Sequence, residues 1–147
     1  KNLLSFYMPE AGVETVAVTV STPDNNTKAV KHITIKVNKP KILFYEVEPL
    51  EGPQYQKELG SAFDLLKSEL SLAAEPYFFS RRGLAKLSYA WSMNDKKIET
   101  PQKPNLLNLT ISEKKTKGAS LVKLSLENPL NILERAEKSL QINFGSE

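Results

Sequence analysis

The sequence contains no cysteine, one histidine and one tryptophan among its 147 residues. Without cysteine the chain has no disulfide framework, no thiolate zinc site and no cysteine nucleophile. No apolar run approaches the roughly 18–20 residues that cross a bilayer, so no membrane insertion is expected within this segment. The chain begins with lysine, as an excised or processed fragment does, so the lack of a hydrophobic leader carries no information about location.

Signals for catalysis, cofactors and nucleic-acid binding are equally scarce. The sequence has no P-loop, dinucleotide fingerprint, nucleophile elbow or metal-binding helix motif. His32 stands alone, and a catalytic triad needs a base that a third group positions. The net charge of +3 is too small and too scattered for a nucleic-acid protein. We therefore predict a protein that is not an enzyme, with no cofactor, no metal and no nucleic acid.

Two groups of oxygen-bearing side chains offer alternatives to that prediction. Glu46, Glu48 and Glu51 cluster before a Gly-Pro pair. Carboxylates grouped in this way can act as a glycosidase pair or bind calcium. The stretch at residues 24–26, Asp-Asn-Asn, supplies further calcium-type oxygens. Neither has the spacing of an EF-hand, and a hairpin turn alone explains the second group.

What the sequence does contain is alternation of period two, clearest around its only tryptophan. Leu87, Tyr89, Trp91 and Met93 alternate with small or polar residues and so share one face of a predicted strand. Asn94-Asp95 ends the run with residues that favour turns. A lone tryptophan on a half-buried strand indicates the anchor of a sandwich core rather than a ligand platform.

Two alternating runs at the beginning of the chain predict a β-hairpin. Residues 13–20 and 29–37 are rich in β-branched residues and flank the turn signal Ser-Thr-Pro-Asp-Asn-Asn-Thr. An isolated two-stranded hairpin is marginal in water, so this one needs another surface to complete it. Pro40 interrupts the pattern, and we predict a boundary that leaves residues 1–38 and 39–147 in separate domains.

The rest of the chain alternates short apolar runs with turn signals, at the spacing of roughly 8–12 residues that is typical of an all-β sandwich. Residues 42–47, 69–75, 96–100, 106–111, 119–127 and 134–144 are the predicted strands. Residues 55–68 are predicted to form a loop with at most one helical turn, with a short strand at 62–65 as the alternative. A helical start at 132–138 is the alternative to the beginning of the last strand.

The order of these strands resembles an immunoglobulin-like antiparallel β-sandwich, and more narrowly the PKD-like domains of bacterial cell-surface proteins. Tyr89-x-Trp91, the polar turn after it and the strands at 105–110 and 121–126 carry the resemblance. The hairpin at 13–37 is similar to the last two strands of a preceding domain of the same kind. Asn-Asp-Lys-Lys at 94–97 replaces the Gly-Asp-Gly that is common after the tryptophan in PKD domains.

The most promising binding residues are Tyr77, Phe78, Arg81 and Arg82, which lie just before the tryptophan strand. Aromatic and arginine side chains dominate binding hot spots, and together they can hold sugars or polyanions. The structural alternative is that Tyr77 and Phe79 complete the core while the arginines begin a loop.

The resemblance implies a non-catalytic structural or interaction module of an extracellular or cell-surface bacterial protein. Its role would be spacing, adhesion or assembly, with a protein or neighbouring copies of similar domains as partners. The alternative is a carbohydrate-binding module attached to a surface enzyme, with a glycan held by Tyr77, Phe78, Arg81 and Tyr55.

Overall fold

The computed structural model describes residues 12–99, 103–111 and 117–145. These residues form two compact units that meet between Lys39 and Pro40. The boundary predicted from the sequence lies one residue earlier. Each unit has its own sheets, so each is described separately.

The first unit is an antiparallel hairpin of β1 (Gly12–Ser21) and β2 (Lys28–Val37), as the alternating runs predicted. Its turn is closed by a hydrogen bond from the Thr22 amide to the Thr27 carbonyl, 3.0 Å. Asn25 takes a positive φ of 58°, which asparagine tolerates better than most residues. Asp24 accepts hydrogen bonds from Thr22 and Asn26, and these lower the pKa of its carboxyl group.

One face of this hairpin is largely apolar and exposed. The register places Val16 opposite Ile33 and Val20 opposite Ala29, so the valines at 16, 18 and 20 share a face with Ile33 and Ile35, which Glu14 and Lys31 interrupt. Val18 and Ile33 nevertheless keep 41% and 43% of their surface exposed, and Val20 keeps 65%. The hairpin thus presents the kind of face that normally packs against another layer.

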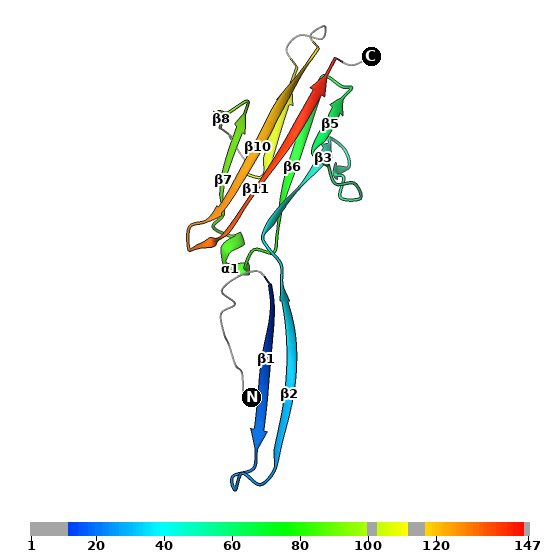
Figure 1. The fold of residues 1–147 in the computed structure, drawn as a ribbon. Helices are drawn as coiled ribbons and strands as arrows, with labels where there is room; N and C mark the ends of the chain where they lie inside the picture. Colours follow the sequence, from blue (N-terminus) through cyan, green and yellow to red (C-terminus); the bar gives the residue numbers. More distant parts are fainter. Residues whose placement is uncertain (1–11, 100–102, 112–116, 146–147) are drawn as a thin grey trace. The chain divides into compact units, whose positions relative to one another are not determined.

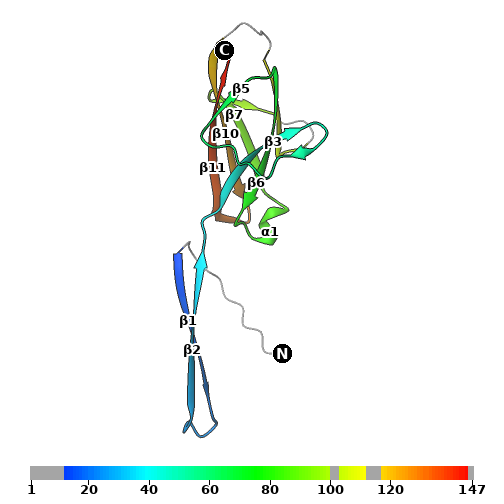
Figure 2. The ribbon, with the colours of Figure 1, turned by 90° about the vertical axis from the view of Figure 1, so that its right-hand side faces the viewer.

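The second unit is a sandwich of two sheets with one short helix (Figures 1 and 2). One sheet has the order β5-β11-β10-β7-β8, and the other has the order β4-β3-β6-β9. All pairings are antiparallel except that of β5 with β11, which is parallel. The elements are β3 (Lys41–Glu48), β4 (Gly52–Pro53), β5 (Ala62–Leu65), β6 (Glu69–Tyr77), α1 (Arg81–Leu84), β7 (Ser88–Met93), β8 (Lys96–Ile98), β9 (Leu106–Thr110), β10 (Gly118–Asn128) and β11 (Asn131–Phe144). The prediction of an all-β sandwich is confirmed.

The core lies between the two sheets and follows the predicted alternation. Leu70, Leu72 and Ala74 from one sheet meet Leu124 and other residues of the opposite sheet in a single buried cluster. In the predicted strand at 119–127, Val122, Leu124 and Leu126 alternate with Lys123 and Ser125 and are each fully buried.

Trp91 joins the two layers. Its ring stacks on Phe44 of β3 with centroids 5.6 Å apart, and only 1% of the residue is exposed. The indole Nε1 donates a hydrogen bond of 2.8 Å to the Pro104 carbonyl, so the one polar atom of this side chain is satisfied. The prediction that Trp91 is a core anchor is therefore confirmed.

The structure decides between the predictions that the sequence left open in three segments. Ala62–Leu65 is a strand, β5, so the loop predicted over residues 55–68 is wrong there and the alternative is right. Asn131–Phe144 is one continuous strand, and the helical alternative at 132–138 is wrong, because pairing with β10 overrides local helix propensity. Arg81–Leu84 forms the short helix α1, where the structural alternative had the two arginines begin a loop. No helix in the described part of the chain is long and apolar enough to cross a membrane.

Candidate functional site

The predicted binding residues lie where β6 ends and α1 begins. Tyr77 is the last residue of β6, and Phe78 follows with a φ of 63°, in the left-handed region that a bulky residue rarely adopts. Ser80 caps α1 by accepting a hydrogen bond of 3.0 Å from the Gly83 amide. Arg81 and Arg82 are exposed on this helical turn, and neither takes part in an ion pair with any residue that the structure describes.

Tyr77 and Phe78 form an exposed aromatic pair with a cation beside it. Tyr77 is 38% exposed and Phe78 is 51% exposed, with ring centroids 6.4 Å apart and an angle of 59° between the ring planes. Lys41, which faces Tyr77 across β3 and β6, places its Nζ 5.9 Å from the Tyr77 ring and 5.7 Å from the Phe78 ring. The two rings are not coplanar, so they do not form a flat stacking platform.

The structural alternative, in which Tyr77 and Phe79 both complete the core, is correct for Phe79 and wrong for Tyr77. Phe79 is buried with 8% exposure and belongs to the core cluster. Tyr77 lies instead on the outer face of its sheet, because it pairs with Lys41 and is out of phase with the buried Leu72 and Ala74.

Tyr55 is linked to the same outer face through Tyr45. The Tyr45 ring meets the Tyr55 ring edge to face at 5.2 Å. A hydrogen bond to Tyr77, with burial and nearby charges adding to it, raises the pKa of Tyr45 to about 12. Tyr55 donates a hydrogen bond of 3.3 Å to Glu75 Oε1. The structure therefore connects Tyr55 and Tyr77 by way of a buried tyrosine that the sequence did not single out.

The α1 segment is fastened to the turn between β10 and β11 by one carboxylate. Glu134 Oε2 accepts hydrogen bonds from the Ser80 amide at 3.3 Å, the Ser80 hydroxyl at 3.1 Å and Asn128 Nδ2 at 2.8 Å. Asn131 Nδ2 donates to the other oxygen at 3.3 Å. A Cβ atom at Gly83 would lie 2.5 Å from both Asn128 Nδ2 and Glu134 Oε2, so this packing requires glycine.

Exposed aliphatic side chains surround this junction, and the sequence reading missed them. Leu130 on the turn is 65% exposed, Ile132 and Leu133 at the start of β11 are 82% and 60% exposed, and Leu84 of α1 is 44% exposed. Figure 1 shows α1 beside the turn at this end of the sandwich. The available signal was an Asn-Pro turn followed by large apolar residues, which is unusual in a solvated loop.

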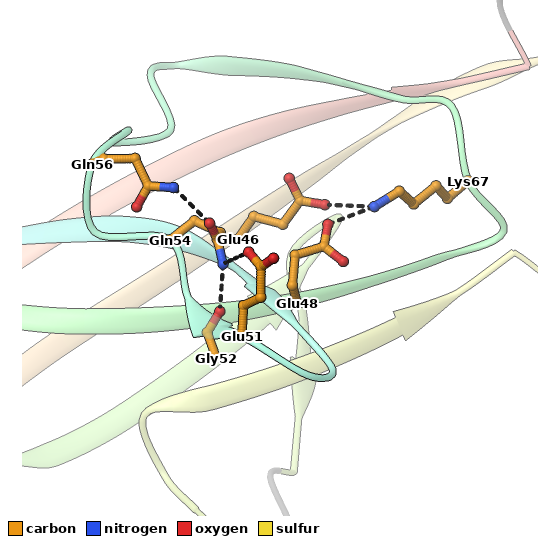
Figure 3. Close-up of polar contacts among 7 residues, drawn as sticks. All are labelled: Glu46, Glu48, Glu51, Gly52, Gln54, Gln56 and Lys67. Atoms are coloured by element: carbon orange, nitrogen blue, oxygen red, sulfur yellow. Dashed lines mark hydrogen bonds and ion pairs between the residues drawn. The ribbon is translucent and has the colours of Figure 1, made fainter.

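The carboxylates Glu46, Glu48 and Glu51 border an open pocket of about 720 Å³ at the other end of β3. Lys67 binds two of them, with Nζ 2.6 Å from Glu48 Oε1 and 3.5 Å from Glu46 Oε1 (Figure 3). The hydrogen bond to Glu48 is the main cause of the raised pKa of Lys67. This shared lysine links the end of β3 to the segment between β5 and β6.

Glu51 takes part in a separate set of contacts in the same pocket. Gln54 Nε2 donates to Glu51 Oε2 at 3.3 Å and to the Gly52 carbonyl at 3.1 Å, and Gln56 Nε2 donates to Gln54 Oε1 at 2.6 Å (Figure 3). Within the described ranges, no three His, Cys, Asp or Glu side chains come together as a metal site. His32 lies exposed on β2.

No family model matches the chain, and no curated protein matches it in sequence.

Proposed function

We propose that this chain is a non-catalytic structural or interaction module of an extracellular or cell-surface bacterial protein, acting in spacing, adhesion or assembly. The observation that carries the proposal is that the chain contains both a complete sandwich core and a separate hairpin whose largely apolar face is exposed. A hairpin of this kind is expected where similar domains follow one another along a chain.

The order of the strands supports an immunoglobulin-like topology. Labelled in chain order, β3, β6 and β9 match the neighbouring strands A, B and E of such a domain, and β7, β10 and β11 match C, F and G. The resemblance of the sequence to PKD-like domains then favours a place at the bacterial cell surface. A tandem array would explain why β1 and β2 resemble the final strands of a preceding domain.

Hydrogen exchange on the 147-residue chain tests this assignment. If the hairpin is the end of a preceding domain, the amides of β1 and β2 exchange rapidly in the isolated chain, because no third strand or layer completes them. The amides of β7 and β10 exchange slowly and serve as the internal control. Protection of β1 in the monomeric chain that equals that of β10 would rule out an incomplete domain.

The alternative function is a carbohydrate-binding module, which the exposure of Tyr77 and Phe78 favours. The exposed rings offer apolar contact to a saccharide, and the neighbouring Lys41 offers charged hydrogen bonds. Titration against a panel of glycans tests this role. Binding that is unchanged in Phe78→Ala and Arg81→Ala variants would remove these residues as the site.

A further inference from the structure

The α1 segment, the β10–β11 turn and the first residues of β11, which Glu134 links by hydrogen bonds, carry a group of exposed side chains. Phe78, Leu84, Leu130 and Ile132 supply its apolar part, and Arg81 and Arg82 supply its charge. We call these six residues the junction surface. Scattered single apolar residues are ordinary on protein surfaces, whereas several exposed apolar residues on elements that touch are typical of an interaction site.

The loops that carry the junction surface are held in place before any partner binds. Glu134 joins Ser80 of the α1 segment to Asn128 and Asn131 of the turn. The Leu130 amide donates to Asn128 Oδ1 at 2.9 Å, and the Leu133 amide donates to Asn131 Oδ1 at 3.2 Å. Binding to a backbone that is already fixed loses less conformational entropy. These exposed side chains are therefore preorganised for contact.

We propose that the junction surface docks a protein segment that carries apolar side chains and carboxylates. Leucine and isoleucine favour a protein over a glycan, because saccharides stack on aromatic rings and gain little from aliphatic side chains. Arg81 and Arg82 form no ion pair with an acidic residue in the part of the chain that the structure describes. Carboxylates of a partner would therefore form ion pairs with these two guanidinium groups. This inference rests on the proposed function as an interaction module and names the partner's chemistry.

Selection of short random peptides displayed on phage against the folded 147-residue chain tests the proposal. The enriched peptides are expected to combine Asp or Glu with Leu, Ile or aromatic residues. Their affinity, measured with synthetic peptides by calorimetry, falls by about tenfold or more in the Ile132→Ser and Arg81→Ala variants. The Arg81→Glu variant prefers peptides in which lysine replaces the acidic residues.

Two matched variants separate a specific surface from general stickiness. Leu50 is 99% exposed on the β3–β4 turn, away from the junction surface, so Leu50→Ser controls for loss of an exposed aliphatic side chain. Lys97→Ala on β8 controls for loss of an exposed cation. Both are expected to bind the selected peptides as the parent chain does. An unchanged thermal midpoint establishes that each variant is folded.

Each contrary outcome decides against the proposal. Enrichment of no peptide, or of peptides whose binding survives Ile132→Ser, would overturn it. Glycan binding that Phe78→Ser abolishes, without any peptide ligand, would assign the surface to a saccharide instead. The exchange rates of β1 and β2 do not depend on this surface, so failure here and failure of the tandem-module proposal are separable.

Discussion

At the scale of single residues, Trp91 is the largest fully buried side chain of the described core. It stacks on Phe44 from the opposite sheet and is almost fully buried. Replacement by alanine opens a cavity between the sheets, so Trp91→Ala is expected to lower the free energy of unfolding by about 3–5 kcal/mol. Urea denaturation followed by circular dichroism measures this loss. Trp91→Phe is the milder control, and near-native stability of the alanine variant would contradict the core assignment.

Lys138 is a charged residue on an inward-facing strand position, in phase with Leu140 and Ile142. Its side chain is only 16% exposed, pairs with Glu58 and places Nζ 5.5 Å from the Phe44 ring. Lys138 is the buried member of this pair, whereas 44% of the Glu58 side chain is exposed, so removal of the lysine stem costs packing that an apolar side chain of similar volume restores. We therefore expect Lys138→Ala to destabilise the sandwich by about 2 kcal/mol or more, and Lys138→Met to cost clearly less.

Thermal unfolding of both Lys138 variants beside the parent chain measures this difference. Lys123→Ala is a suitable control, because Lys123 forms a more exposed ion pair with Glu137. Equal losses in the alanine and methionine variants would show that the charge, rather than the packing of the stem, stabilises this position.

Glu134 should make stability depend on pH. Burial alone would raise its pKa, but hydrogen bonds from Asn128, Ser80 and Asn131 together lower the pKa below the ordinary value of 4.5. A lowered pKa in the folded state stabilises the fold above the unfolded pKa, and this stabilisation is lost as the pH falls through the folded pKa. Glu134→Gln is expected to cost on the order of 1–2 kcal/mol near neutral pH.

Denaturation curves of the parent and Glu134→Gln chains across acidic to neutral pH give the comparison. The difference in unfolding free energy should be fully present above about pH 5 and shrink below pH 4. A difference that stays constant over this range would mean that the ionised carboxylate is not what holds the turn to α1.

At the scale of elements, the short helix α1 depends on Gly83. An alanine Cβ would come into hard contact with Asn128 and Glu134, and neither can retreat without losing its hydrogen bonds. Gly83→Ala is therefore expected to destabilise the sandwich by about 1–3 kcal/mol, although alanine is the better helix former. Leu84→Ala, in an exposed position of the same turn, should cost little. Equal stability of the two variants would contradict the packing role of Gly83.

The elements that the sequence predicted well are those with strict alternation on one buried face. In β10, Val122, Leu124 and Leu126 alternate without exception, and the strand follows that pattern. One element was harder to predict because the strand pairing that decides it is distant in sequence. β5 exists through its pairing with β11, from Ala62–Gln141 to Leu65–Phe144, and no local pattern records a partner so far along the chain.

The candidate site was predictable in its composition but not in its assembly. Tyr77, Phe78, Arg81 and Arg82 were visible as a run of aromatic and cationic residues. Their neighbours were not visible, because Ser80 and Glu134 are 54 residues apart. Spacing within one segment cannot show which second loop approaches it. The carboxylates at 46, 48 and 51 show the same limit, since the lysine that binds two of them lies beyond β5.

At the scale of the whole molecule, the division at Pro40 makes a simple prediction about unfolding. The described core cluster draws its members from residues that follow Pro40, from Ile42 onward. Residues 40–147 alone should therefore unfold in one cooperative transition with the same midpoint as in the 147-residue chain. Calorimetry of the two chains measures this. A midpoint clearly lower in the shorter chain would show that the hairpin stabilises the sandwich.

The parallel pairing of β5 with β11 also determines how the sandwich resists mechanical unfolding. β5 belongs to the early part of this unit and β11 ends it, so a pull on the two ends drags these strands along their length in opposite directions. The backbone hydrogen bonds between Ala62–Leu65 and their partners in β11 are then loaded in shear and must break together. In the β1–β2 hairpin both ends leave from the same side, so a pull unzips its ladder pair by pair.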